Sequence, residues 1–251
     1  MAKKAISFGL VHIPIEINPI IYNNDKAFNQ LHKKCGERIK YQKICPHCNE
    51  QVENKDIIKG YEYNPDKYVT FTDKDFDKLK LSSNTPIEII SFVNLKEIDP
   101  VYFEKSYQIS TKNSSKAFSL FKEALNKEKK VALATTVIGT KFYYCIIRFE
   151  KNNLILNTLY FDEEINLVNN TADEKITNKE LDLAIQLIKA MTGKFEPKKY
   201  KDQYQDNIEK AIEEKVSGKE ITKVKDKTTK SIKDLMTALK KSIKETKKWA
   251  F

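Results

Sequence analysis

Residues 31 to 63 read LHKKCGERIKYQKICPHCNEQVENKDIIKGYEY, a stretch that holds three of the four cysteines and the densest basic cluster outside the C-terminal tail. His32 and Cys35 are separated by two residues, and so are Cys45 and Cys48. A two-residue gap lets one tight turn present two ligands to the same ion, and zinc takes four tetrahedral ligands from thiolate sulfur and imidazole nitrogen. The spacing therefore predicts one structural zinc ion per chain, held by His32, Cys35, Cys45 and Cys48.

A simpler alternative stays open for the same residues. One CxxC pair is a weak signal by itself, and reduced cysteines can sit in a small core with His32 at a helix end. His47 lies between Cys45 and Cys48, where its side chain should point away from an ion held by its neighbours. Cys145, in the apolar run FYYCII, is expected to be a buried strand residue. Such cysteine use fits a reducing compartment better than a disulfide framework.

The same stretch is strongly basic. Between Lys33 and Lys43 there are five basic residues and one acid, Glu37. Such a face can be ordinary solvated surface, but phosphate contacts require charge and position without base-reading geometry. The predicted DNA-binding residues are Lys33, Lys34, Arg38, Lys40 and Lys43, with Lys59 further along the chain.

Several segments together resemble the bacterial form of Ku, the DNA-end-binding family of non-homologous end joining. They are HKKCGERIKYQKICPHC followed by DIIKGYEY, the N-terminal AISFGLVHIPIEI, Glu97 to Ile109 (EIDPVYFEKSYQI), and Asp234 to Ile243 (DLMTALKKSI). The segments occur in the expected order over nearly the whole chain. The resemblance implies a homodimeric ring that encircles duplex DNA at a broken end. It also implies a β-barrel from which residues 31 to 63 project as part of a bridge.

The resemblance further implies a protein partner. The region from Thr177 to Gly218 is similar to the part of bacterial Ku that recruits the multifunctional ATP-dependent DNA ligase of this pathway. Aromatic residues often anchor interfaces, so Tyr200 and Tyr204 are the expected anchors. The partner-binding residues predicted from this are Tyr200, Tyr204, Ile208 and Ile212. In the family the bridge resembles an atypical zinc ribbon whose ligands many members lack, so the fold is expected to survive without metal.

Composition independently favours a polyanionic partner. The chain has 251 residues, a formal net charge of +10 and a sequence pI near 9.1. Nearly all of the basic charge is lysine, because only Arg38 and Arg148 are arginine. Bidentate contacts to base edges favour arginine, so the composition argues against sequence-specific readout. No apolar run reaches the length of a membrane span, and a cytoplasmic, nucleoid-associated protein is expected.

Apolar periodicity predicts a mixed but mainly β fold. Residues 5 to 22 read as two strands broken near Gly9, with Val11, Ile13, Ile15 and Ile17 on one face. Asn64, Pro65 and Asp66 predict a hairpin turn, and Thr72 begins a short helix. One helix is expected from Ser114 to Lys129. The remaining strands are expected at Pro86 to Val93, Lys105 to Ser110, Val131 to Ile138, Phe142 to Phe149 and Leu154 to Tyr160. So many strands with few helices favour a barrel.

The C-terminal part is expected to be helical. Thr177 and Glu180 form a capping-box pattern that begins one helix, whose apolar stripe is Leu181, Ile185, Ile188 and Met191. A second apolar stripe begins at Tyr204 and ends before Gly218. Residues 219 to 251 carry eleven lysines against four acids, and Ser231 is expected to begin an amphipathic helix. That helix is expected to dock on a partner, lie along DNA, or fold back onto its own domain. The predicted domains are a core of residues 1–176 with an insertion at about 25–80, a helical arm (177–218) and a basic linker with the last helix (219–251).

No catalytic site is expected. The chain has three histidines and six glycines, and it contains no phosphate-binding loop, nucleophile elbow or HExxH motif. One enzymatic alternative stays open, a lysine amine that attacks the aldehyde of an abasic DNA end as a Schiff base. A third alternative is a zinc-ribbon transcription or RNA-binding factor, which the long β core disfavours.

Overall fold

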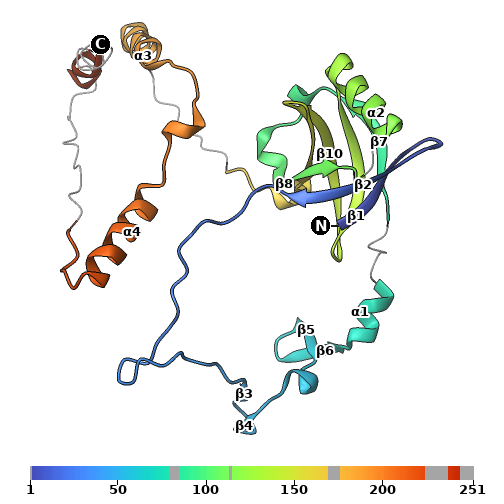
Figure 1. Cartoon of the computed structure of the whole chain (residues 1–251), viewed down its shortest axis with the longest axis vertical. Coiled ribbons are helices and arrows are strands. Elements are labelled where there is room, and N and C mark those ends of the chain that lie inside the picture. Colours follow the sequence, from blue (N-terminus) through green and yellow to red (C-terminus); the bar gives the residue numbers. More distant parts are fainter. Residues whose placement is uncertain (1, 80–84, 113–114, 169–175, 224–236, 244–251) are drawn as a thin grey trace. The chain divides into compact units, whose positions relative to one another are not determined.

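The computed structural model describes residues 2–79, 85–112, 115–168, 176–223 and 237–243. The chain divides into two compact units, one of residues 1–24 and 29–167 and the other of residues 25–28 and 168–251. The first unit contains a β-barrel and a basic insertion, and the second contains mostly helices (Figure 1). Among the described residues, no helix combines the length and the apolar composition that crossing a bilayer requires.

Seven strands close into a barrel in the order β1-β2-β8-β11-β10-β9-β7. Figure 1 shows the barrel. Neighbouring strands are antiparallel except β1 and β7, which pair in parallel through Ile6 with Ile87 and Ser7 with Glu88. Closure leaves the barrel without a free sheet edge. The predicted barrel is confirmed, with strands β1 (Ala2–Phe8), β2 (Val11–Pro19), β7 (Ile87–Val93), β8 (Phe103–Ser110), β9 (Val131–Ile138), β10 (Lys141–Glu150) and β11 (Asn153–Leu159).

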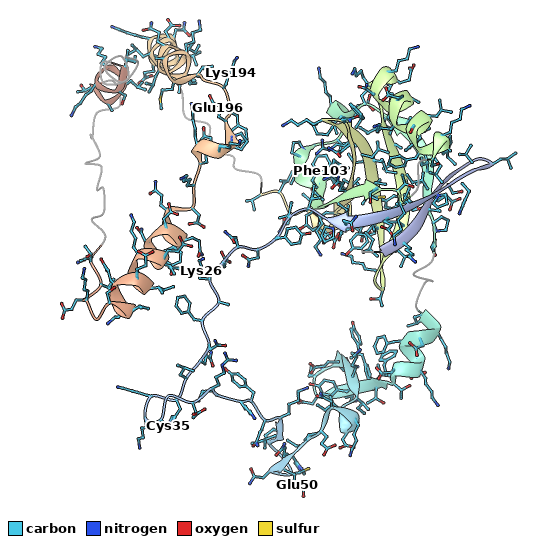
Figure 2. The ribbon with its side chains drawn as sticks, in the orientation of Figure 1. Lys26, Cys35, Glu50, Phe103, Lys194 and Glu196 are labelled. Carbon is cyan, nitrogen blue, oxygen red and sulfur yellow. The ribbon has the colours of Figure 1, made fainter. Side chains whose placement is uncertain are left out.

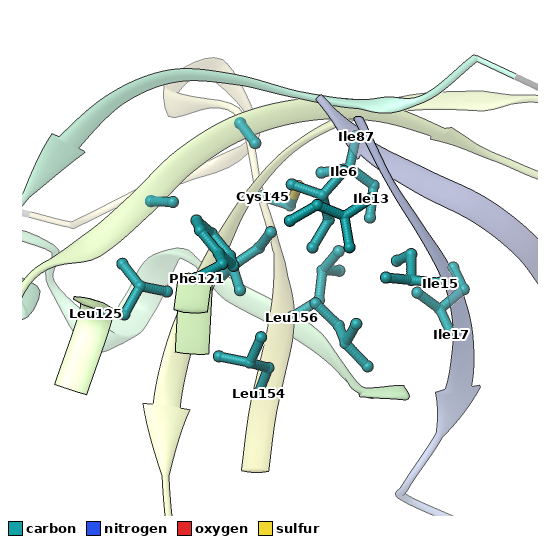
Figure 3. Close-up of a cluster of buried hydrophobic side chains, with 14 residues drawn as sticks. Ile6, Ile13, Ile15, Ile17, Ile87, Phe121, Leu125, Cys145, Leu154 and Leu156 are labelled. Atoms are coloured by element: carbon teal, nitrogen blue, oxygen red, sulfur yellow. The ribbon is translucent and has the colours of Figure 1, made fainter. Parts of the chain in front are cut away.

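The barrel core is built by side chains that alternate along the strands. On β2, Ile13, Ile15 and Ile17 expose 3% or less, as the period of two predicts, whereas Val11 at the strand start is exposed. Helix α2 (Lys116–Glu128) adds Phe121 and Leu125 to the same core (Figure 3). Each such buried side chain contributes about 1.5–3 kcal/mol, so the barrel is a stable scaffold for the parts it carries. Cys145 is fully buried there, as predicted, and burial raises the pKa of its thiol to about 12.

One of the two arginines belongs to the barrel wall. Arg148 donates from Nε to Asn157 Oδ1 (3.0 Å) and from a terminal nitrogen to Glu150 Oε2 (3.0 Å). Asn157 is buried and donates in turn to Ser106 Oγ (2.7 Å). A buried amide must be hydrogen-bonded, so Arg148 serves the packing of β8, β10 and β11.

The insertion between β2 and β7 has no core of its own. It contains two two-stranded hairpins, β3 (Ile44–Cys45) with β4 (Glu50–Gln51) and β5 (Lys59–Asn64) with β6 (Lys67–Phe71). Helix α1 (Asp73–Leu79) follows Thr72, whose N–H and hydroxyl both donate to Asp75 Oδ2. No side chain from residue 25 to 79 is buried. Isolated two-stranded hairpins with so little packing are marginally stable in water.

The described part of the second unit contains α3 (Asn178–Met191) and α4 (Gln203–Val216). The predicted capping box is confirmed, since Thr177 Oγ1 accepts from Glu180 N (3.3 Å) and Glu180 Oε2 accepts from Thr177 N (2.8 Å). Residues 237–243 are helical, while Ser231 to Met236, where the last predicted helix would begin, lie outside the described residues. Short 3₁₀ turns complete the two units at Asn54–Asp56, Leu95–Glu97, Pro100–Tyr102, Asp162–Glu164 and Pro197–Lys199 (η5).

Candidate nucleic-acid interface

The His32–Cys35 pair lies in its own tight turn. Leu31 and Arg38 form an isolated β-bridge across it, and Gly36 N donates to His32 O (2.8 Å). Gly36 has φ +75°, a left-handed conformation that glycine adopts without strain. The turn brings His32 Nδ1 within 3.1 Å of Cys35 Sγ, and Cys35 is labelled in Figure 2.

The Cys45–Cys48 pair lies in a second turn, at the end of the β3–β4 hairpin. Asn49 N donates to Cys45 O (2.8 Å), and Asn49 takes the left-handed conformation with φ +54°. The backbone N–H groups of Cys48 and His47 hydrogen-bond the Cys45 sulfur and lower the pKa of that thiol. Cys48 hydrogen-bonds the same sulfur, which raises the pKa of its own thiol.

The structure brings each predicted ligand pair together but does not bring the two pairs together. Within the described part of the chain, no three histidine, cysteine, aspartate or glutamate side chains form a cluster that would hold a metal ion. The zinc site therefore stays a prediction.

Four of the six predicted DNA-binding cations have no side-chain partner among the residues that the structure describes. Lys33 and Lys34 lie inside the turn closed by the Leu31–Arg38 bridge, and Lys40 follows it. All of these side chains are exposed. Among the described residues, no hydrogen bond or ion pair involves Lys33, Lys34, Arg38 or Lys40. These four residues are called the turn cations.

The other two predicted cations contact the protein. Lys43 Nζ donates to Asn54 Oδ1 (2.7 Å). Lys59 Nζ lies 4.4 Å from the ring centroid of Phe76, which itself packs on Phe71 with ring centroids 5.6 Å apart. Lys59 therefore joins the β5–β6 hairpin to α1 by a cation–π contact, a role that its sequence context did not indicate.

In the second unit, the short segment Asp25–Phe28 packs on α4. Lys26 N donates to Gln205 Oε1 (3.2 Å), and Gln205 Nε2 donates to Asp25 Oδ1 (3.2 Å). Lys26 Nζ lies 2.6 Å from Glu209 Oε1, a hydrogen-bonded ion pair that lowers the pKa of Glu209 (Lys26 is labelled in Figure 2). Segment 25–28 is called the strap.

The strap and α4 enclose an apolar slot. Phe28 lies beside Ile208 and Ile212, and the cavity between them has a volume of about 310 Å³. Its remaining lining is Ala211, Lys215, Val216 and Ile221. Two of the predicted partner-binding residues, Ile208 and Ile212, therefore line one site, and Tyr204 is exposed one turn before them on the same helix.

The fourth predicted partner-binding residue lies apart from this slot. Tyr200 follows η5 and stacks on Phe195, with ring centroids 5.4 Å apart and an angle of 25° between the planes. Both rings are largely exposed. Phe195 was not singled out from the sequence, although an aromatic residue on each side of Pro197 is a signal that could have been used.

The strap was also missed by sequence reasoning. Its contacts join residues about 180 positions apart, for example Asp25 and Gln205. The residues themselves, DKAF, carry no motif. Only the folded chain shows that Phe28 and Lys26 belong to the helical unit.

Comparison with known proteins identifies one family whose members match most of the chain. The model of the Ku family, described as the Ku70/Ku80 beta-barrel domain, matches residues 7–183. The chain is 39% identical over 248 residues to the non-homologous end joining protein Ku of Lachnoclostridium phytofermentans, covering 98% of this chain and 96% of that protein. It is 37% identical to the protein of the same name from Heliobacterium modesticaldum (98% and 91% covered) and 36% identical to that from Bacillus subtilis (99% and 82% covered).

Proposed function

The chain belongs to the Ku family, and from this premise we propose that two copies of it form a ring that threads onto the end of a DNA duplex. As a member of this family it is a non-enzymatic DNA-end-binding protein of non-homologous end joining, which repairs double-strand breaks. The ring, its lack of sequence preference, the zinc ion and the ligase partner are the finer parts of the proposal.

The main support for the proposal is that the turn cations are exposed and have no partner among the described residues. A positive side chain without a protein partner keeps its full charge for an external anion, and the regularly spaced phosphates of DNA supply one. Three of the four are lysines, which act as point charges and do not read base edges as arginine does. The second arginine, Arg148, is held by Asn157 and Glu150 in the barrel wall. These contacts support binding that is independent of sequence.

Competition between linear and circular DNA tests the ring. A closed ring loads only at an end, so an unlabelled linear duplex should displace a labelled linear duplex, whereas a covalently closed circle of the same sequence should not. Raising the salt concentration should weaken the linear complex steeply, because binding releases counterions from the phosphates. Gel-shift or anisotropy titrations measure both effects. Equal competition by the circle would contradict threading.

Zinc in the insertion is the second part of the proposal. The donor set of one imidazole and three thiols suits a structural zinc site, and each pair already lies in a tight turn. His32, Cys35, Cys45 and Cys48 would hold the ion. Since no side chain from 25 to 79 is buried, a metal that joins the two turns would supply stability that packing does not.

Metal analysis of protein purified without chelator should find one zinc ion per chain. A Cys45→Ser, Cys48→Ser double variant should lose the ion and should be cleaved faster by protease within residues 25–79. A Glu50→Gln variant is the matched control, because Glu50 lies on β4 beside the same turn and is not a proposed ligand, whereas His47 Nδ1 lies 3.9 Å from Cys48 Sγ. Absence of zinc from the unmodified protein would refute this part of the proposal.

Recruitment of the multifunctional ATP-dependent ligase of bacterial end joining is the third part. The apolar slot of α4 supports it, because Phe28, Ile212 and Val216 remain exposed at its edge. Tyr204, on the same helix, is an exposed aromatic residue of the kind that anchors interfaces. Tyr200, the fourth residue of the predicted set, stacks on Phe195 and does not line this slot.

A further inference from the structure

Residues 194–201 read KFEPKKYK and connect α3 to α4. They combine four lysines and one glutamate with two aromatic residues, Phe195 and Tyr200. Lys194 and Glu196 are labelled in Figure 2. Cations interleaved with aromatic rings are typical of surfaces that bind single-stranded nucleic acid, where the rings stack on bases and the cations follow the backbone.

The local backbone holds the two rings together. Pro197 begins the 3₁₀ turn η5, in which Lys199 N donates to Glu196 O (2.9 Å) and Tyr200 N donates to Pro197 O (3.1 Å). This single turn separates the two aromatic residues, and their rings meet in a stacked arrangement at 5.4 Å. The pair is therefore a preformed platform, and a ligand would not have to order it.

The platform is open to solvent. Phe195 is 77% exposed and Tyr200 is 70% exposed. Two large aromatic rings with this much exposed surface are suited to a flat ligand. An unpaired nucleobase offers such a π-face, while the bases of an intact duplex are already stacked on one another.

The charge around the platform favours an anionic ligand. Glu196 Oε1 lies 3.0 Å from Lys199 Nζ and neutralises that lysine. Within the described residues, Lys194, Lys198 and Lys201 form no ion pair. Three lysines therefore remain available beside the two rings, an arrangement that matches a ligand with both aromatic groups and phosphates.

We propose that residues 194–201 bind the single-stranded overhang of a DNA end, with bases stacked on Phe195 and Tyr200 and phosphates beside Lys194, Lys198 and Lys201. This activity goes beyond duplex binding, since it adds affinity only where a strand is unpaired. It also gives Tyr200 a ligand different from the protein partner proposed for the α4 slot.

The test compares a blunt duplex with the same duplex carrying a 3′ thymidine tail of about eight nucleotides, within the usual size of such sites. The tail contains 2-aminopurine, whose fluorescence falls when it stacks on an aromatic ring. The full-length protein should bind the tailed duplex about tenfold more tightly than the blunt duplex and should quench the probe. A Phe195→Leu, Tyr200→Leu variant should lose both the added affinity and the quenching, with unchanged affinity for the blunt duplex.

Three further variants separate stacking from charge and from general loss of structure. Phe195→Tyr with Tyr200→Phe keeps both rings and should behave like the unmodified protein, as should Tyr22→Leu, which removes an equally exposed tyrosine elsewhere. Lys198→Gln with Lys201→Gln should make the salt dependence of the added affinity shallower, by about 0.7 in the log–log slope for each lost contact.

Equal affinity of the unmodified protein for both duplexes, or a leucine variant that still quenches the probe, would overturn the proposal. If the leucine variant lost ligase stimulation on blunt ends and kept its preference for the tail, the segment would be a protein-docking site instead. If the protein did not bind duplex DNA at all, that result would contradict the ring proposal. The Phe195–Tyr200 platform could still be tested by quenching of a single-stranded oligonucleotide that carries the same 2-aminopurine tail.

Discussion

Replacing the turn cations with glutamine is expected to weaken binding to a linear duplex by about 4,000-fold near 0.1 M salt. The set is Lys33, Lys34, Arg38 and Lys40. At this salt concentration each counterion released by a phosphate contact contributes just under a tenfold gain in affinity, so four lost contacts multiply to this size. The log–log salt slope should become shallower by about 0.9 per contact, and more if both copies in a dimer contribute. Anisotropy titrations over a range of salt concentrations measure both quantities.

A charge-matched variant is the control for that experiment. Lys116, Lys127, Lys129 and Lys151 lie on or near α2 and the β10–β11 turn, and their replacement by glutamine lowers the net charge by the same amount. The control should reduce affinity only slightly, since long-range attraction is screened by salt. Equal losses in the two variants would mean that net charge, and not the position of the turn cations, holds the DNA.

The barrel was predictable because its strands carry a strong local pattern. Alternation of apolar residues along Ile13, Ile15 and Ile17 fixes which face is buried, and the apolar stripe of α2 fixes which face packs on the core. The hairpin at residues 59–71 was predictable from Pro65 and Asp66, which form the turn between β5 and β6. The parallel pairing of β1 with β7 was not predictable, because no local signal links Ile6 to Ile87.

The candidate site was predictable only in part, for the same reason. Spacing correctly placed His32 near Cys35 and Cys45 near Cys48, since a tight turn brings residues at that separation together. Spacing could not decide whether the two turns meet. It also could not show that Lys59 rests on Phe76, or that Phe28 packs beside Ile208, because these contacts depend on tertiary folding.

The largest loss of ligase stimulation is expected from changes in the apolar slot on α4. Replacing Ile212 and Val216 with alanine should reduce ligase stimulation about 30-fold, the size expected for one interface hot spot of about 2 kcal/mol. Ile212 is 39% exposed and Val216 is 83% exposed, so their loss should cost the fold little. Nick sealing at limiting ligase concentration measures the effect, and affinity for duplex DNA should not change.

Two exposed apolar residues on α3 supply the matched control. Ile188 and Met191 are 65% and 68% exposed, and their replacement by alanine removes a similar apolar area from the same unit. This variant should stimulate the ligase normally. Equal losses in both variants would indicate a general effect on the helical unit.

Truncated chains can separate the role of the slot from the role of the basic tail (residues 224–251). The contacts of α4 determine the residue at which the truncated chain should end. Charge alone suggested a boundary after Gly218. However, Ile221 lines the slot, and Thr222 donates from N and Oγ1 to the Glu214 carboxylate (2.8 and 2.7 Å), so residues up to Lys223 belong with α4. A chain that ends after Lys223 should keep ligase stimulation.

The same truncation should weaken DNA binding and flatten its salt dependence, because it removes nine lysines and only three acids. A chain that ends before Thr177 should lose stimulation altogether, since it lacks α3 and α4. Loss of stimulation in the longer of these two chains would place the docking element between residues 224 and 251 instead. The α4 slot would then be a contact that holds the strap in place, and the Ile212 and Val216 variant would stimulate the ligase normally.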